Sequence, residues 1–286
     1  MKIDGTQPDQ PRFAIVSGGD EIRLRSYVNH RIYAHERGFD YRLECGIDQG
    51  IKNKFYYKMS IINRILPLYE WIVWIDDDAF FTDFEATNLE DFIARAEAEN
   101  KFLVIAEGAV EPNGWWSKIN TGVFILRNDE RGRRLMKMMM DSDLAEVQEW
   151  WEEDRDGLFT NGDQDQMWWA LNASGLIEDT IVVDQLQLNS RGHFYHDSLQ
   201  DAFVMHFAGH RDKPLGIARF ANRFEVGHEL VPVDLLDKYG VAVRSPMTDA
   251  EYKARAARQE AIGRTKRFAK PLVHKFREIR ARRSGA

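Results

Sequence analysis

The stretch from residue 71 to residue 83 most constrains what this chain can fold into, because an apolar run leads directly into three acids. The five apolar or aromatic residues Trp71–Ile75 are typical of a strand that is buried on both faces of a sheet. The carboxylates of Asp76, Asp77 and Asp78 repel one another, and a divalent cation such as Mg²⁺ or Mn²⁺ would remove that repulsion. Ligands of open α/β sheets bind beyond the carboxyl ends of the strands. The stretch therefore predicts a metal-and-phosphate site at Asp76 and Asp78, with a solvated acidic turn as the alternative.

Strand-like and helix-like segments alternate between residues 12 and 240, which are expected to form one domain. Apolar strand segments are expected at 13–16, 41–45, 71–75, 102–106, 121–126, 181–183 and 203–207. Helical spacing of apolar residues predicts helices at 24–35, 55–69, 88–96, 129–152 and from 163. Asn88 is expected to cap the third of these helices. The alternation predicts an α/β domain with a mainly parallel sheet flanked by helices.

The first strand is expected to end in a tight turn at residues 17–20. Glycine allows a ligand or another backbone to approach closely, so Ser17 and Gly18 are candidates for contact with a nucleotide. An ordinary turn explains the glycines equally well.

Polar side chains also gather at the ends of several later elements. These segments are Asn120–Phe124 at the start of a strand, Asp163–Gln164 at the start of a helix, Asn189–Arg191 after a hydrophobic run, and His206–His210 at the end of a strand. A neutral imidazole is a suitable third ligand for a metal that two carboxylates hold. Residue types alone leave open which histidine binds, and a purely structural histidine is the simpler interpretation of each one taken singly.

The charge distribution separates an acidic body from a basic tail. The net charge is −7, although residues 251–286 contain 12 Lys and Arg against three Glu. The acidic body argues against a nucleic-acid-binding face. Cys45 is the only cysteine, which excludes an intrachain disulfide and is consistent with a reducing compartment. Neither a signal peptide nor a run of roughly 18 apolar residues is recognisable, so a cytoplasmic protein is expected.

The tail at residues 250–286 is expected to be a basic amphipathic helix. Its apolar stripe consists of Phe268, Leu272, Phe276 and Ile279, among many Lys and Arg residues. This pattern is typical of a helix at an anionic membrane surface, which would make the protein peripheral on the cytoplasmic membrane face. A helix that packs on the catalytic domain with a solvated basic face is the alternative.

Taken in order, these segments resemble a known enzyme family. The matching pieces are residues 33–39, Lys58, Trp74–Ala79, Asn120–Phe124, Asp163–Gln164, Asn189–Ser190 and His206–Gly209. The set resembles the galactosyl/mannosyltransferase family (glycosyltransferase family 34), which includes fungal α-galactosyl- and mannosyltransferases and plant xyloglucan xylosyltransferases. The resemblance covers residues 12–210. The sequence departs from the family pattern at Asp77, where a small residue is usual, and at His210, where cysteine is common.

The resemblance implies a GT-A nucleotide-diphospho-sugar transferase fold with a Rossmann-like sheet. It implies a metal-dependent retaining glycosyltransferase that moves a hexose, with galactose expected, from a UDP-hexose to a hydroxyl of a glycan or glycolipid. Mn²⁺ or Mg²⁺ would bind to Asp76, Asp78 and His206. The donor would contact Ser17, Gly18, Lys58, Asp76 and His206, and the catalytic residues would be Asp163, Gln164 and Asn120. The relative roles of Asp163, Gln164 and Asp165 stay open.

Two other functions also fit parts of the sequence. A haloacid-dehalogenase-like phosphohydrolase would use Asp76 as its nucleophile, but Phe80 occupies a position where that motif expects Thr or Val. A non-catalytic module that binds a nucleotide sugar is the third possibility.

Asp78 is expected to be an isolated surface carboxylate, whose removal would leave the fold intact.

Overall fold

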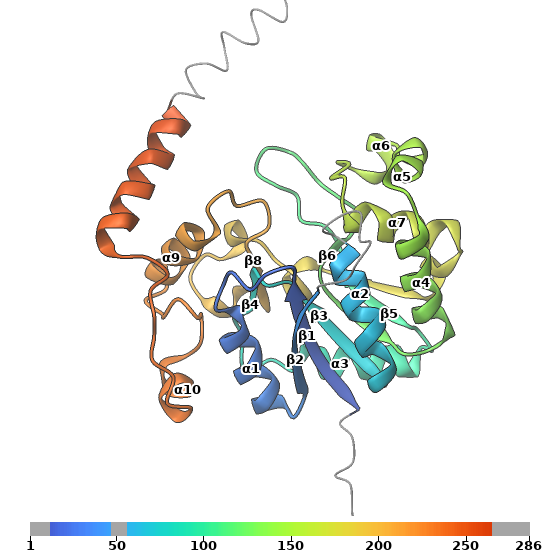
Figure 1. Cartoon of the computed structure of the whole chain (residues 1–286), viewed down its shortest axis with the longest axis horizontal. Helices are drawn as coiled ribbons and strands as arrows, with labels where there is room; N and C mark the ends of the chain where they lie inside the picture. The colour runs from blue at the N-terminus through green and yellow to red at the C-terminus, as the bar shows by residue number, and fades with distance from the viewer. Residues whose placement is uncertain (1–11, 47–55, 265–286) are drawn as a thin grey trace, which may run out of the picture.

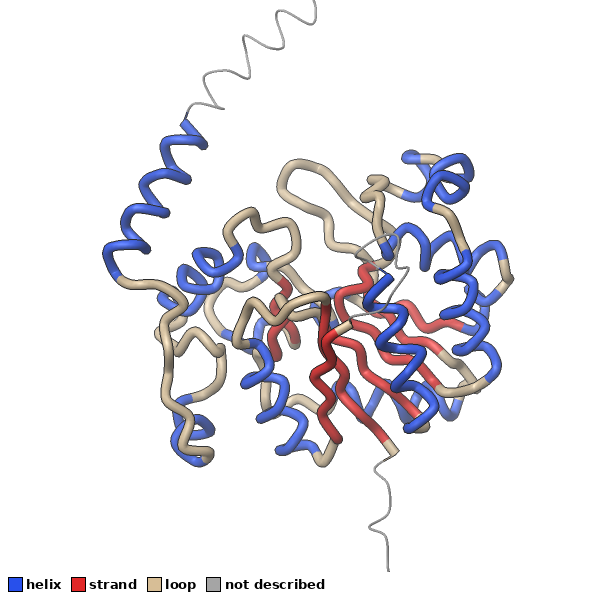
Figure 2. The backbone as a smooth tube through the Cα atoms, in the orientation of Figure 1, coloured by secondary structure: helices blue, strands red, loops and turns tan. Residues whose placement is uncertain are grey.

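A computed structural model describes residues 12–46 and 56–264 of the chain (Figures 1 and 2). Within this part, the main sheet has the strand order β2-β1-β3-β6-β5-β7. Its strands are β1 (Phe13–Gly19), β2 (Asp40–Cys45), β3 (Trp71–Ile75), β5 (Leu103–Ala106), β6 (Asn120–Arg127) and β7 (Thr180–Val183). Only β6 runs antiparallel to its neighbours. The sheet is therefore mainly parallel, as the sequence predicts.

Helices cover both faces of this sheet (Figure 2). In chain order they are α1 (Ser26–Arg37), α2 (Tyr56–Ile65), α3 (Asn88–Ala98), α4 (Glu130–Asp141), α5 (Leu144–Trp150), α6 (Glu153–Asp156), α7 (Asp163–Ala173), α8 (Gln185–Leu188), α9 (Lys213–Arg223) and α10 (Val233–Lys238). Residues 249–264 form a further helix. Short 3-10 turns occur at Leu66–Leu68, Leu176–Asp179, Gly192–Phe194 and Leu199–Asp201.

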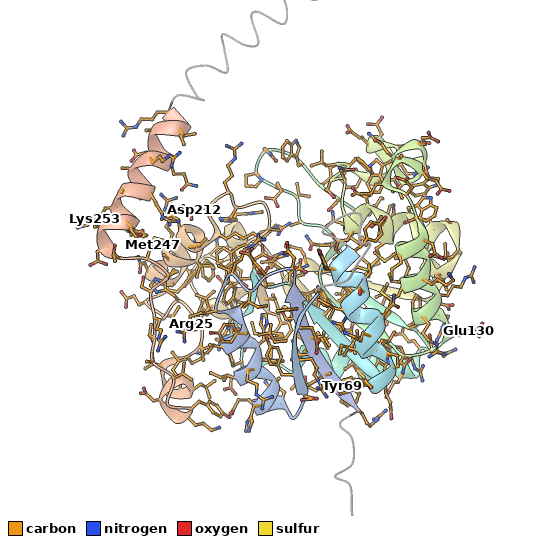
Figure 3. All side chains as sticks on the ribbon, viewed as in Figure 1. Arg25, Tyr69, Glu130, Asp212, Met247 and Lys253 are labelled. Carbon is orange, nitrogen blue, oxygen red and sulfur yellow. The ribbon has the colours of Figure 1, made fainter. Side chains whose placement is uncertain are left out.

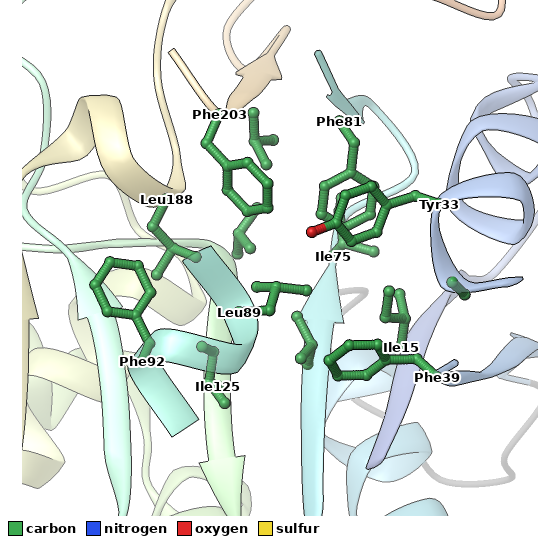
Figure 4. Packing of buried hydrophobic residues seen from close by; sticks show 14 of the residues in the cluster. Ile15, Tyr33, Phe39, Ile75, Phe81, Leu89, Phe92, Ile125, Leu188 and Phe203 are labelled. Atoms are coloured by element: carbon green, nitrogen blue, oxygen red, sulfur yellow. The ribbon is translucent and has the colours of Figure 1, made fainter. Parts of the chain in front are cut away.

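The central strand β3 is buried on both faces, because successive side chains of a strand point to opposite sides. Trp71, Val73 and Ile75 belong to the core that α1 and α3 cover. Ile72 and Trp74 belong to the core beneath α2, α4 and α7. In the first core the rings of Tyr33 and Phe81 stack with their centroids 3.9 Å apart (Figure 4).

A second, two-stranded sheet positions the candidate site. After the acids the chain enters β4 (Ala79–Phe81), which pairs antiparallel with β8 (Val204–His206). In this register Ala79 lies opposite His206. The sequence analysis does not predict β4, because three apolar residues are too few to show strand periodicity. The pairing brings His206 next to residues that are more than 100 positions earlier in the chain.

The expected turn at residues 17–20 is wrong for its first three residues. Ser17, Gly18 and Gly19 continue β1 and pair with Leu43–Cys45 of β2. A side chain at Gly18 would overlap the backbone carbonyl of Glu44. Gly18 therefore allows β2 to approach β1 closely, and this packing accounts for the glycine without a nucleotide.

Two helix boundaries also differ from the sequence expectations. The predicted helix at 129–152 is two helices, because the extended backbone of Ser142 ends α4. The side chain of Asp143 then caps α5 by accepting a hydrogen bond from the N–H of Ala145. Asn88 is the first residue of α3 instead of its cap, and its amide donates to the carbonyl of Gln187. The side chain of Asn88 thus binds a distant backbone carbonyl instead of capping its own helix.

The helix at 249–264 contacts α9. Arg255 forms an ion pair with Asp212 at 3.1 Å, and Arg219 donates a hydrogen bond to Gln259. Asp212 and Met247 lie at the base of this helix (Figure 3). The predicted stripe from Phe268 to Ile279 lies outside the described residues, and the division into a domain at 12–240 and a tail at 250–286 stays a prediction. Among the described helices, none has the length and apolarity needed to cross a membrane.

Candidate active site

The acids after β3 are held by backbone contacts to β6 and to the residue that follows β8. The N–H of Asp76 donates to the carbonyl of Gly122 in β6, and the N–H of Phe207 donates to the carbonyl of Asp78, at 2.8 and 2.9 Å. Trp74 donates its indole N–H to Oδ1 of Asp76 at 2.7 Å. The carboxylates therefore have defined positions at the carboxyl end of the central strand.

Three side chains converge in a geometry that suits a divalent cation. Ligand atoms of Asp76, Asp78 and His206 all lie within 4.8 Å of one another. His206 Nε2 is 3.2 Å from Asp78 Oδ1 and 3.8 Å from Asp76 Oδ2. The other carboxylate oxygens contact lysines, with Lys58 Nζ 2.9 Å from Asp76 Oδ1 and Lys213 Nζ 2.7 Å from Asp78 Oδ2. One oxygen of each carboxylate thus faces the imidazole, and two carboxylate oxygens with one imidazole nitrogen fit Mn²⁺ or Mg²⁺.

A chain of amide hydrogen bonds determines which nitrogen of His206 faces the carboxylates. The backbone N–H of Gly122 donates to Asn120 Oδ1 at 3.0 Å, and the Asn189 amide donates to the same oxygen at 2.6 Å. The carbonyl oxygen of the Asn189 side chain therefore faces His206 Nδ1, at 3.0 Å. This oxygen can only accept, so Nδ1 is the nitrogen that donates, and Nε2 is the nitrogen that faces the acids and is free to bind a metal. Asn120, predicted to be catalytic, lies in this chain behind His206.

Lys58 joins the acids to Asp163. Its Nζ lies 2.6 Å from Asp163 Oδ2 and donates to the carbonyl of Thr121 at 3.0 Å. The Thr121 hydroxyl donates to Asp163 Oδ2 at 2.9 Å. Burial opposes the charge of Lys58, but the carboxylates of Asp163 and Asp76 outweigh it and raise the pKa of Lys58 well above its usual range. Lys58 is therefore a permanent cation between the predicted catalytic and metal-binding residues.

Asp78 is not the isolated surface carboxylate that the sequence analysis expects. Only 3% of the residue is exposed. Burial opposes its ionisation, but His206 and Lys213 lower the pKa of Asp78 well below its usual range. By contrast, burial and the two neighbouring acids raise the pKa of Asp77 to about 6. Removal of Asp78 would therefore leave Lys213 and His206 without their carboxylate, which changes how its mutants must be designed.

The structure separates the acidic residues at the start of α7. Asp165 is fully buried and accepts hydrogen bonds from the N–H and hydroxyl of Thr160 and from the N–H of Gly162. These bonds hold the loop that precedes α7, which gives Asp165 a structural role. Asp163 contacts Lys58, and Gln164 is half-buried beside it.

Other predicted residues lie farther from the acids or lack a defined partner. His210 is exposed and packs edge-on against Phe207, outside the group formed by Asp76, Asp78 and His206. Ser17 is buried, and among the described residues its hydroxyl has no hydrogen-bond partner. The contact of Ser17 and Gly18 with a nucleotide stays a prediction.

Sequence reasoning missed Lys213, the first residue of α9. It follows Asp212, whose side chain accepts from the N–H of Leu215 and caps the helix. The only local signal is this helix start, which is common in proteins. Its pairing with Asp78, 135 positions earlier, depends on the fold alone.

The chain has a GT-A glycosyltransferase fold. Its acids lie beyond the central strand of the main sheet, and the histidine comes from the second sheet. The solved structure of a glycosyltransferase involved in glycosylation of the major capsid of PBCV-1 matches 75% of this chain and 100% of that chain, with a TM-score of 0.52 and 18% identity. This likeness confirms the predicted fold. The chain belongs to the galactosyl transferase GMA12/MNN10 family, whose model matches residues 7–212. That match confirms the family resemblance.

Curated relatives are similar over part of their length. Galactomannan galactosyltransferase 1 of Cyamopsis tetragonoloba is 28% identical over 159 residues, which span 53% of this chain and 35% of the relative. Xyloglucan 6-xylosyltransferase 2 of Arabidopsis thaliana is 27% identical over 139 residues, or 43% of this chain and 29% of the relative. The chain therefore spans about a third of the length of these relatives.

Proposed function

We propose that this chain is a metal-dependent retaining glycosyltransferase, which moves a hexose from a UDP-sugar to a hydroxyl of a glycan or glycolipid. The observation that carries the proposal is the convergence of Asp76 Oδ2, Asp78 Oδ1 and His206 Nε2. Family membership and a relative named as a galactosyltransferase support galactose as the sugar. The same membership does not favour the phosphohydrolase alternative.

In this proposal the chain provides positive charge where the donor loses its diphosphate. Mn²⁺ or Mg²⁺ held by Asp76, Asp78 and His206 would offset the charge of the diphosphate. Lys58 and Lys213 add cations on both sides of the carboxylates. The bond between the anomeric carbon and a diphosphate oxygen breaks, and the acceptor oxygen bonds to that carbon on the same face. The acceptor proton passes to the departing diphosphate oxygen.

We propose that Asp163 and Gln164 act on the sugar instead of on the diphosphate. Lys58 contacts both Asp76 and Asp163, so Asp163 lies close to the proposed metal ligands. A carboxylate and an amide at that position would stabilise the positive charge that develops on the sugar ring as the glycosidic bond breaks.

Calorimetric titration with UDP and with UDP-galactose tests this function. We expect binding in Mn²⁺ to be at least about tenfold tighter than in EDTA, a difference of about 1.4 kcal/mol. Equal affinity under both conditions would contradict the metal role. Transfer to an acceptor, or slow hydrolysis of UDP-galactose, would distinguish an enzyme from a module that only binds. Hydrolysis of simple phosphate esters without a nucleotide sugar would instead favour the phosphohydrolase.

His206→Ala should weaken Mn²⁺ binding by about 10–100-fold, whereas His210→Ala should leave it nearly unchanged. His206 Nε2 faces both carboxylates, and His210 lies outside this group. Both substitutions remove one imidazole, so they form a matched pair for calorimetry. A larger loss in His210→Ala would reverse the assignment of the metal ligand.

Gly122→Ala should also weaken Mn²⁺ binding, by about tenfold or more, although no ligand is removed. A methyl group at this position would overlap the His206 imidazole and displace it. Gly263→Ala is a suitable control, since its methyl group would meet no atom of the described residues within 4 Å. If Gly122→Ala and the control bind Mn²⁺ equally well, the position of the imidazole is not critical.

We also propose a cytoplasmic location and an attraction of the basic tail at 250–286 to an anionic membrane face. The apolar stripe of this tail lies outside the described residues. Sedimentation of the full chain with vesicles of anionic lipid, at low and high salt, tests the tail. We expect binding that weakens as salt rises. A chain that ignores these vesicles at low salt would contradict the membrane role.

A further inference from the structure

A pocket of about 490 Å³ lies between the loop at 107–118 and residues 185–194. Its volume is within the range of small-molecule sites. The residues that matter most for its chemistry are Glu107, Trp116, Lys118, Gln185 and Phe194. None of them has a role in the proposed chemistry at the acids, so the pocket needs its own explanation.

The pocket lies at the same edge of the sheet as the acids. Glu107 directly follows β5, and Asn120 at the start of β6 pairs with Ala106 at the end of β5. β6 lies between β5 and β3, and Asp76 follows β3. Neighbouring strands are about 4.8 Å apart, so Glu107 is displaced from Asp76 by about 10 Å along this edge. A donor sugar at the acids would therefore have this pocket as its neighbour.

One wall of the pocket is attached to the segment that delivers Asp163. The carbonyl of Trp116 accepts a hydrogen bond from the N–H of Leu158 at 2.9 Å, and Ser117 forms a β-bridge with Gly157. From Gly157 the chain runs directly to Asp163 at the start of α7. The pocket is thus linked to the residue proposed to act near the anomeric carbon.

The opposite wall is attached to the segment that carries His206. Arg191 donates to Glu111 of the loop at 3.0 Å and reaches the carbonyl of His206 at 3.5 Å. Gln185, which lines the pocket, accepts from the hydroxyl of Ser190 at 3.2 Å. The two walls are therefore connected to the two halves of the candidate site.

The lining combines aromatic faces with hydrogen-bonding groups of both charges. The half-buried Trp116 ring has Lys118 Nζ 5.4 Å from its centroid, and Phe194 adds a second ring. Glu107 and Gln185 supply a carboxylate and an amide. A pyranose has an apolar C–H face and a rim of hydroxyls, which match a ring and such polar groups. A diphosphate would need excess positive charge, whereas this lining contains one lysine and one glutamate.

We infer that this pocket binds a pyranose ring of the acceptor glycan, with Trp116 as the surface on which the ring stacks. The inference rests on the proposed function, because it assigns the second substrate of that reaction. It makes Trp116 and Glu107 determinants of acceptor specificity, separate from the residues that hold the donor.

Paired tryptophan variants of the full chain test the inference. Trp115 is the neighbouring residue, is 56% exposed and does not line the pocket, so Trp115→Ala is the matched control for Trp116→Ala. The probe is an immobilised array of manno-, gluco- and galacto-oligosaccharides, in the presence of Mn²⁺ and UDP. We expect Trp116→Ala to lose retention on the array by about tenfold or more, since it removes the aromatic face on which the pyranose stacks. Trp115→Ala should behave as the unmodified chain.

Further readouts separate this inference from the proposed function. UDP binding in Mn²⁺ and hydrolysis of UDP-galactose should be unchanged in Trp116→Ala, which also shows that it folds. Trp116→Phe should restore most of the retention. Glu107→Gln, in a chain that keeps Trp116, should lower the retention. Full retention by Trp116→Ala would overturn the inference, and so would an unmodified chain that hydrolyses UDP-galactose but retains no oligosaccharide. A chain that binds no nucleotide would overturn the proposed function itself, and the inference with it.

Discussion

Asp78→Asn should reduce transfer by about 10²–10³-fold and should remove most of the Mn²⁺-dependent gain in UDP affinity. The amide keeps the size of the side chain but loses the charge that faces His206 and Lys213. Asn is preferable to Ala here, because Ala would leave a hole beside the buried imidazole of His206. Calorimetry with Mn²⁺ and UDP-galactose, together with denaturant unfolding, measures both effects.

Asp77→Asn is the matched control for Asp78→Asn. Asp77 lies between the two proposed ligands in sequence but is outside the group that converges on His206. We expect this variant to keep its Mn²⁺-dependent UDP affinity within a few-fold of the unmodified chain. Full transfer activity in Asp78→Asn would remove the metal site from the mechanism.

Lys58→Met should lower the free energy of unfolding by about 3–5 kcal/mol and should also abolish transfer. Lys58 is only 11% exposed and is the cation within 2.9 Å of both Asp76 and Asp163. Methionine fills a similar volume but leaves two carboxylates close together without the cation. The measurement is denaturant unfolding in EDTA, so that metal binding does not mask the loss.

Lys213→Met provides the comparison for Lys58→Met, because Lys213 contacts the same acidic group from the other side but is 40% exposed. Because Lys213 is partly exposed and Asp78 keeps His206 as a neighbour, this variant should lose less stability than Lys58→Met. The double variant Lys58→Met/Asp163→Asn should regain part of the stability, because it removes one of the unpaired carboxylates. Equal losses from the two lysine variants would show that Lys58 does not hold the site together.

Local sequence patterns predicted the layers of this fold well, since they depend on short-range rules. The apolar run Trp71–Ile75 is β3, and the residues it buries alternate between two cores as a strand requires. The helix expected at 24–35 is α1 (Ser26–Arg37), which Gly38 ends with a φ of 73°. Errors occurred where a distant partner decided the outcome, as at Gly18, whose neighbour is the backbone of Glu44.

The sequence by itself determined the central strand, the position of the acids after it and the order of segments that reveals the family. Those features are encoded by neighbouring residues along the chain, so one sequence is enough to find them. The tertiary structure alone decided that β8 pairs with β4 and brings His206 to the acids, that Lys213 joins Asp78, and that Asp163 faces Lys58 while Asp165 turns into its own loop. Each of these contacts is selected by strand register or helix packing among residues that are far apart in sequence, or by which face of α7 is buried, and no local pattern encodes those choices.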